Sequence, residues 1–478
     1  MTKLFCCAIY TLISTWFAAS TLAANQPNII LMISDDQAWS GLSVPMHPTV
    51  KDSKSPLVQT PNLEKLASQG MRFSAAYAPA SVCAPTRISM QLGRSPAALH
   101  WTKAAKSVTG YKLIPPTNIR HIPKDATTIA ELLKEAGYAT AHYGKWHIGG
   151  GGPGQHGYDE HDGDIGNEYT HRFGDPNPAD IFGMAKRASA FMEVNSKANR
   201  PFFIQMSWHA LHAPQNALKE TLAKYQKLAP RGNEKQIGSA AIAENLDTGV
   251  GMVMDTIDRL GLRDNTFVIY MSDNGSGGKR GPLKGGKGSV WEGGIRAPFI
   301  IRGPGVKAKS WCHVRVVGYD LFPTICGWAG VHANKLPTNI EGGSIASFVS
   351  NEGKGEVKRP REELVFHFPH YQSDDGPHSA ILLGDYKLMK FYETGRIALF
   401  DLSKDIGEQN DLSRSMPDKA RQLDERLKNY LSAVKAQMPR PNPNYDPNNP
   451  PPPRKKGGRG EQPDKPRSKK DKQRKDAL

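Results

Sequence analysis

The sequence predicts an α/β protein with a large, mixed but mostly parallel sheet sandwiched by helices, followed by a smaller antiparallel-sheet subdomain. Two observations support this prediction. Four short apolar runs each end in charged or metal-competent residues, and helical patterns separate them. After about residue 333, short strand-like runs instead follow one another through turns. With 478 residues, the chain is long enough for two or three such units.

The four apolar runs predict strands buried on both faces, because apolar residues fill consecutive positions instead of alternate ones. These runs span residues 28–34, 138–143, 201–207 and 266–272. Helical spacing predicts helices at 60–70, 127–136, 239–260 and 319–330, and one more strand at 299–302. The alternation of strands and helices predicts helices on both faces of the sheet.

Each of the four strands is followed by polar residues. They are Asp35 and Asp36, Lys145 and His147, His212, and Asp273 and Asn274. Parallel strands end at one edge of a sheet, where ligands bind in open α/β folds, so we expect these side chains to converge. Each pair alone is also typical of a solvated turn, but four such turns together favour a site.

The segment around Cys83 is the strongest chemical signal. Pro85 follows the thiol by two residues and fixes a turn, and Arg87 follows it by four. A guanidinium beside a nucleophile suits a substrate with a tetrahedral oxyanion. A lone cysteine is more often a small buried hydrophobe, but the order Cys-x-Pro-x-Arg with Gly93 and Arg94 behind it favours a nucleophile.

The polar residues at the strand ends predict a metal and an ester site. Paired aspartates and an Asp-Asn pair are hard oxygen ligands that favour Ca²⁺ or Mg²⁺ over zinc. A glycine-rich loop at 281–288 adds Lys284 and Lys287, although a flexible surface loop is the alternative. Cations and histidines around such an ion are typical of a site for a sulfate or phosphate ester.

The Cys83 segment resembles the signature of the sulfatase family, Cys-x-Pro-Ser-Arg followed by Leu-Thr-Gly-Arg. The similarity extends from Pro27 to about Leu412, through Gly-Lys-Trp-His at 144–147 and Ser-Asp-Asn-Gly at 272–275. It continues through Gly-Gly-Lys-Gly, Trp-Glu-Gly-Gly-Ile-Arg and Asp-Leu-Phe-Pro-Thr. Thr86 stands in place of the usual serine, and Gln91-Leu92 replaces Leu-Thr. The resemblance implies an alkaline-phosphatase-like fold.

The resemblance also implies roles for particular residues. Cys83 would be oxidised to formylglycine (3-oxoalanine) by a maturation enzyme, and its hydrate would attack sulfur. The Ca²⁺ ligands, with Mg²⁺ as the alternative ion, would be Asp35, Asp36, the modified Cys83, Asp273 and Asn274. The other catalytic residues would be Arg87 and Lys145 as anion holders, His147 as base, and His212 as acid helped by Lys287. His209 is a rival for His212, because Leu211 replaces a proline of the family pattern.

The ends of the chain predict export. Residues 1–24 have the charge, apolar run and small-residue end of a secretory signal, with a membrane anchor as the alternative. We expect a catalytic domain at 25–333, a C-terminal subdomain at 334–438 and a disordered tail at 439–478. The net charge is +16, and residues 454–478 hold eleven Lys/Arg against four Asp/Glu. Such a tail either contacts polyanions or is simply solvated.

The C-terminal subdomain is predicted to hold four strands and a last helix. They lie at 364–371, 379–383, 386–390, 398–401 and 418–438. His367, His370 and Tyr371 suggest part of a sugar-binding wall, with ordinary packing as the alternative. Cys312 and Cys326 either pair or stay as buried thiols, and the sequence leaves both open.

The leading functional hypothesis is a secreted or periplasmic sulfatase acting on sulfated carbohydrate. The alternatives are a phosphonate monoester or phosphodiester hydrolase of the same superfamily, and a non-catalytic polyanion-binding protein if Cys83 stays unmodified. No stable membrane anchor and no nucleic-acid partner are expected.

Overall fold

The computed structural model describes residues 26–277, 281–449 and 451. The expected signal segment and most of the expected tail lie outside the described residues. The large sheet has eight strands in the order β10-β2-β9-β8-β1-β7-β5-β6. They are β1 (Asn28–Ser34), β2 (Met71–Phe73), β5 (Ala139–Gly144), β6 (Glu160–His161), β7 (Phe202–Ser207), β8 (Thr266–Ser272), β9 (Phe299–Arg302) and β10 (Ser310–Cys312).

The four strands predicted from apolar runs are neighbours in the centre of this sheet. β1 pairs in parallel with both β7 and β8, and β5 pairs in parallel with β7. β9 runs antiparallel to β8, so the sheet is mixed but mostly parallel, as predicted. Alternate residues of β1 enter different cores: Ile30 and Met32 enter one, Ile29 and Leu31 the other.

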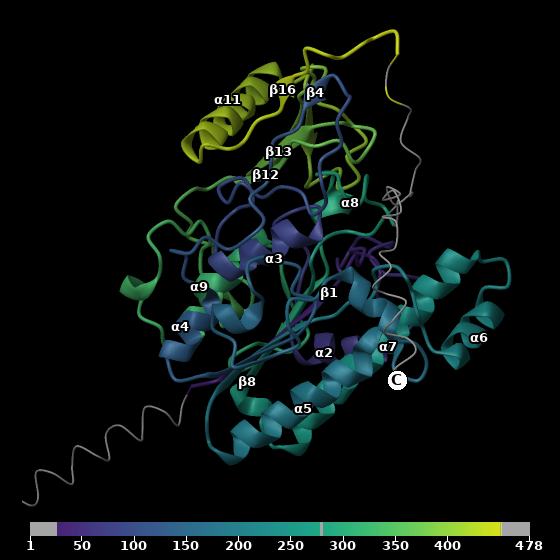
Figure 1. Ribbon diagram of the computed structural model, residues 1–478, viewed down its shortest axis with the longest axis vertical. Coiled ribbons are helices and arrows are strands. Elements are labelled where there is room, and N and C mark those ends of the chain that lie inside the picture. The colour runs from purple at the N-terminus through teal and green to yellow at the C-terminus, as the bar shows by residue number, and fades with distance from the viewer. Residues whose placement is uncertain (1–25, 278–280, 450, 452–478) are drawn as a thin grey trace, which may run out of the picture.

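Helices cover both faces of the sheet (Figure 1). One core cluster contains residues of α2 (Pro61–Gln69), α5 (Ile181–Lys197), α6 (Lys219–Leu228) and α7 (Glu234–Arg259). The other contains residues of α3 (Cys83–Leu92), α4 (Ile129–Glu135) and α9 (Leu321–Trp328). Thr128 and Glu131 form a capping box on α4, which fixes where that helix begins. The sequence analysis missed α5 and α6.

The predicted antiparallel subdomain is confirmed. Its sheet has the order β12 (Leu364–Phe368), β13 (His378–Leu383), β14 (Tyr386–Phe391) and β15 (Ile397–Asp401). One face packs on α11 (Pro417–Ala433), for example Leu388 and Leu399 against Leu423. The other face packs on the part of the chain that holds the large sheet, where Phe366 lies in one cluster with Trp291.

Shorter elements complete the structure. They are β3 (Ala76–Tyr77), β4 (Leu113–Ile114), β11 (Val316–Val317), β16 (Arg440–Pro441), α8 (Glu292–Ile295), α10 (Ala346–Val349) and the 3₁₀ helices η1 (Pro153–His156), η2 (Asn167–Arg172), η3 (Pro178–Asp180), η4 (Arg263–Asn265), η5 (Gly318–Asp320) and η6 (Ala333–Lys335). Within the described part of the chain, no helix has both the length and the apolar character needed to cross a bilayer.

Cys312 and Cys326, which the sequence left open, are both buried free thiols. Cys312 ends β10, and Cys326 lies in α9. Burial raises the pKa of Cys312 to about 11 and that of Cys326 to about 12, so both stay protonated at neutral pH. They therefore act as small apolar side chains of the core.

Candidate active site

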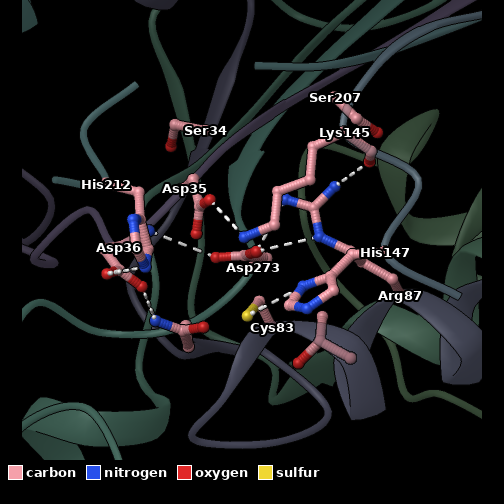
Figure 2. Close-up of polar contacts among 12 residues, drawn as sticks. Ser34, Asp35, Asp36, Cys83, Arg87, Lys145, His147, Ser207, His212 and Asp273 are labelled. Carbon is pink, nitrogen blue, oxygen red and sulfur yellow. Dashed lines mark hydrogen bonds and ion pairs between the residues drawn. The ribbon is translucent and has the colours of Figure 1, made fainter. Parts of the chain in front are cut away.

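The loops that follow the four central strands are joined by backbone hydrogen bonds. The amide of Asp35 donates to Ala210 O at 2.8 Å, and the amide of Lys145 donates to Ser207 O at 2.8 Å. The amide of Asp273 donates to the last residue of β1 at 3.0 Å. The structure thus brings the polar residues at the strand ends to one edge of the sheet, where Figure 2 shows them facing one another.

Cys83 and Arg87 enter this cluster from α3. The helix begins at Cys83, so Arg87 lies one turn later on the same face, and both side chains are buried. Arg87 Nη2 and Nε donate to Asp273 Oδ2 at 2.7 and 3.2 Å, and Nη1 donates to Lys145 O at 2.5 Å. One guanidinium thereby fixes the ends of β8 and β5 relative to the cysteine.

Two buried carboxylates of the site have opposite pKa shifts. Burial alone would raise the pKa of Asp35, but Lys145, 2.5 Å away, and the other nearby positive charges hold it well below its usual range. Burial and the charge of Asp35 raise the pKa of Asp273 to about 8. Like charges buried side by side repel each other, and a bound cation relieves this repulsion.

The side chains fit such a cation. The ligand atoms of Asp35, Cys83 and Asp273 all lie within 4.8 Å of one another. Asp35 Oδ1 and Asn274 Oδ1 are buried and have no hydrogen-bond partner in the structure. Unpaired buried oxygens of this kind suit a hard divalent ion such as Ca²⁺. Asp36 differs, because its carboxylate accepts from Lys287 and from Asn274 Nδ2, each at 2.7 Å.

His147 lies beside the cysteine. Its Nδ1 is 3.4 Å from Cys83 Sγ, and its backbone has a φ of 57° at the sharp turn after β5. Burial, reinforced by the positive charges of Lys145 and Arg87, lowers the pKa of His147 to about 3. The imidazole is therefore neutral at physiological pH and can accept a proton.

His212 lies on the other side of the site. Its Nε2 is 3.9 Å from Asp36 Oδ2, and burial lowers its pKa while the charge of Asp35 opposes this. Its rival His209 is fully buried against Tyr169, with ring centroids 5.4 Å apart and both ring nitrogens unpaired. His212 is thus the histidine of this loop that faces the cluster.

The two lysines of the glycine-rich loop separate. Lys287 points into the site and binds Asp36, and this neighbour raises its pKa despite burial, so it stays charged. Lys284 instead lies over the Trp291 ring, 3.8 Å from the ring centroid. Of the two, only Lys287 belongs to the cluster.

The sequence analysis missed Asn167. Its Nδ2 lies 3.1 Å from His212 Nε2, and it begins η2 in the long connection after β5. No local pattern marks it, because its place depends on the folding of the whole connection. Ile165 in the same connection anchors it, accepting from the amides of Trp146 and His147 at 3.0 and 3.1 Å.

The hypothesis of a sugar-binding wall at His367, His370 and Tyr371 is wrong. His370 is fully buried, with Thr102 Oγ1 at 2.7 Å from one ring nitrogen. His367 and Tyr371 are only 6% and 4% exposed, and Tyr371 stacks on Tyr111 at 4.3 Å. His370 and Tyr371 attach the connection after α3 to the C-terminal sheet, and His367 bonds Ser379 and Gln437 O, which is the packing alternative.

The family models and the relatives that this chain matches are all of sulfatases. Residues 27–331 match the family model described as Sulfatase, and residues 286–437 match N-sulphoglucosamine sulphohydrolase, C-terminal. The chain is 28% identical to human arylsulfatase A, over 88% of this chain and 90% of the relative. It is 31% identical to rat N-acetylgalactosamine-6-sulfatase, over 67% of each.

Solved structures share the fold. Ps i-CgsB in complex with k-i-k-neocarrahexaose matches with a TM-score of 0.70 at 24% identity, covering 85% of this chain and 93% of that one. BT4656 in complex with D-glucosamine-2-N,6-O-disulfate matches with a TM-score of 0.66 at 21% identity, covering 86% and 98%. At these identities the likeness bears on the fold alone.

Proposed function

This chain belongs to the sulfatase family of sulfuric ester hydrolases, and from that premise we propose that it is an exported enzyme that removes sulfate from carbohydrates. One observation carries the proposal. A cysteine, two histidines and the cations of Arg87, Lys145 and Lys287 surround a buried carboxylate cluster at the carboxyl edge of the sheet. Such an arrangement neutralises an anionic transferred group and offers proton donors and acceptors on both sides of it.

We assign the metal to Asp35, Asp36, Asp273 and Asn274, with the modified Cys83 completing the set. Ca²⁺ is the preferred ion, because the ligands are hard oxygens and two of them lack any other partner. When bound, the ion and the formylglycine hydrate derived from Cys83 supply charge neutralisation and an oxygen nucleophile. The protein orients the ligands of the ion: Arg87 forms an ion pair with Asp273, and Lys145 forms one with Asp35.

The remaining side chains divide the proton transfers. His212, at the outer side of the cluster, donates a proton to the departing oxygen, helped by the charge of Lys287. His147 is neutral, and its Nδ1 lies 3.4 Å from Cys83 Sγ. It would accept the proton of the hydroxyl that the modified residue 83 carries. Arg87 and Lys145, at the back of the site, hold the hydrate and the sulfate oxygens.

The substrate class rests on the relatives. N-acetylgalactosamine-6-sulfatases are named for a sulfated sugar, and solved neighbours hold a neocarrahexaose and a glucosamine disulfate. The signal-like residues 1–24 support export, and with it a maturation enzyme that converts Cys83 before or during export.

The test is release of inorganic anions from a panel of sulfated oligosaccharides, aryl sulfates and phosphate esters, measured by ion chromatography. The protein is made in a host that forms formylglycine, and mass spectrometry reports the state of residue 83. We expect sulfate from at least one member and none from the Cys83→Ala variant. Phosphate without sulfate, or no sulfate from protein that carries the aldehyde, would contradict the proposal.

A further inference from the structure

Residues 95–124, which connect α3 to α4, reach the wall of the active site that carries His147. His121 forms a parallel bridge with Gly149, two residues after His147. A Cβ added to Gly149 would lie 2.4 Å from Arg120 O, so the two segments are in direct backbone contact. The connection therefore passes beside the loop that carries His147.

The same connection also reaches the wall that carries Lys287. The amide of Leu113 donates to Tyr371 Oη at 3.0 Å. The next residue, Gln372, lies against Gly288, where an added Cβ would be 2.4 Å from Gln372 Nε2. Because Gly288 directly follows Lys287, the connection lies along the rim of the site from one wall to the other.

This connection carries positive charge and no negative charge. Residues 95–124 contain no Asp or Glu, and their cations are Lys103, Lys106, Lys112, Arg120 and Lys124. Lys106, Lys112 and Arg120 are exposed, and we call these three the basic rim. Among the residues that the structure describes, no acidic side chain forms an ion pair with any of the three. Their charge is therefore available to an anion from solution.

The last strand of the described chain is attached to the basic rim. β16 pairs with β4 in antiparallel register, with Arg440 opposite Ile114 (Figure 1). The amide of Asn442 then donates to Lys112 O at 3.0 Å, and its Nδ2 donates to Tyr111 O at 2.8 Å. The C-terminal end of the chain is therefore anchored beside the mouth of the active site.

The sequence after this anchor is strongly basic. Residues 454–478 hold eleven Lys/Arg against four Asp/Glu. Arg454 is the first cation after Asn442, and even a fully extended chain would bring it no farther than about 40 Å from the anchor. Cations of one sign beside the mouth of a site raise the local concentration of an anionic ligand.

We propose that the basic rim and the basic residues 454–478 bind sulfate groups of a polysulfated carbohydrate chain while one ester of that chain lies in the active site. This inference rests on the proposed function and adds that the substrate carries several sulfates. A sulfated chain is the occupant because the cations lie beside a site for a sulfate ester, so that neighbouring sulfates of the same chain reach them.

The first test measures binding without catalysis, in Cys83→Ala protein titrated calorimetrically with dextran sulfate. One variant ends at Asn449, and another carries Lys106→Gln and Arg120→Gln. At about 50 mM salt we expect the Kd to rise about tenfold in the first and about threefold in the second. At about 500 mM salt both changes should fall below about twofold, because salt screens exposed charges.

The matched control carries Lys197→Gln and Lys309→Gln, which remove the same charge. These exposed lysines come just before β7 and β10, at the edge of the sheet opposite the active site. Unchanged Kd in the truncated and rim variants, or an equal loss in the control, would overturn the proposal. Binding to phosphatidylglycerol vesicles that needs residues 450–478, without binding to dextran sulfate, would overturn it in favour of a membrane surface.

The second test uses protein that carries the aldehyde and sulfated oligosaccharides of increasing length. We expect kcat/KM for sulfate release to rise with chain length, and to rise less in the protein that ends at Asn449, with equal values for a single sulfated sugar. The same dependence on chain length in both proteins would overturn this inference alone. If the wild type releases no sulfate from any ester, the proposed function fails, whereas the titration with dextran sulfate still tests the basic rim.

Discussion

Replacing Lys387 with methionine removes the cation that lies between two buried carboxylates at the junction of the catalytic part and the C-terminal sheet. Lys387 Nζ is 2.9 Å from Glu292 Oε1 and 2.8 Å from Glu408 Oε1, and all three side chains are 0% exposed. Methionine has nearly the same length but no charge. Removing one partner of a buried ion pair costs about 3–5 kcal/mol, because the remaining charge stays uncompensated.

The free energy of unfolding lost in Lys387→Met should be larger at high pH than at low pH. Burial and the charge of Glu292 raise the pKa of Glu408 to about 7 from an ordinary 4.5, although Lys387 opposes this. A carboxyl with a raised folded-state pKa stabilises the fold at low pH and loses that contribution as pH rises through this range. Without Lys387 the pKa rises further, so at pH 5 Glu408 is neutral in both proteins and the difference between them shrinks.

Equilibrium unfolding in urea at pH 8 and pH 5 measures this. We expect a loss of about 3–5 kcal/mol at pH 8 and about half of that or less at pH 5. The matched control is Lys404→Met in the same subdomain, where an 83% exposed lysine pairs with Asp401 and should cost at most about 1 kcal/mol. A loss at pH 8 no larger than that of the control, or equal losses at both pH values, would refute the reasoning.

Three further predictions concern the active site. Arg87→Lys should lower kcat/KM for sulfate release at least about 100-fold, because lysine cannot reproduce the fork on Asp273; activity within threefold of wild type would contradict this. Chelation with EDTA should lower the melting temperature measured by calorimetry and added Ca²⁺ should restore it, whereas an unchanged melting temperature would argue against a resident ion. Gly275→Ala should destabilise the fold by about 1–3 kcal/mol, because the added Cβ would lie 1.9 Å from Gly293 O. Gly277→Ala is the control, since its Cβ would meet no atom within 4 Å. Equal melting temperatures of the two variants would contradict the steric argument.

The central strands and the edge where they end could be predicted from the sequence because their signals are local. Residues 28–34 are apolar at consecutive positions, and Asp35 and Asp36 follow at once. A parallel sheet then brings such ends together whatever the order of the strands. The order itself, with β1 between β7 and β8, has no local signal, because it is decided by how the helices pack on each face.

The parts that sequence reasoning missed depend on contacts between distant segments. Asn167 matters only because the connection after β5 folds back onto the loop after β7. From the sequence alone, His370 could be an exposed ligand group. In the fold it is buried and bonds Thr102, which lies far from it in sequence. Polar residues whose partners lie far away in sequence cannot be separated, from composition alone, into those that face a ligand and those that pack.

The central position of β1 has a consequence for how the chain folds. This strand is made first, but its two partners, β7 and β8, follow about 170 and 240 residues later. Strand pairs between segments this far apart in sequence form slowly, so the apolar strand β1 stays unpaired at least until β7 has been synthesised. During the same interval Cys83, which is 1% exposed in the folded protein, is still open to an enzyme that would modify it. The proposed conversion of Cys83 would therefore have to take place before the sheet closes around it.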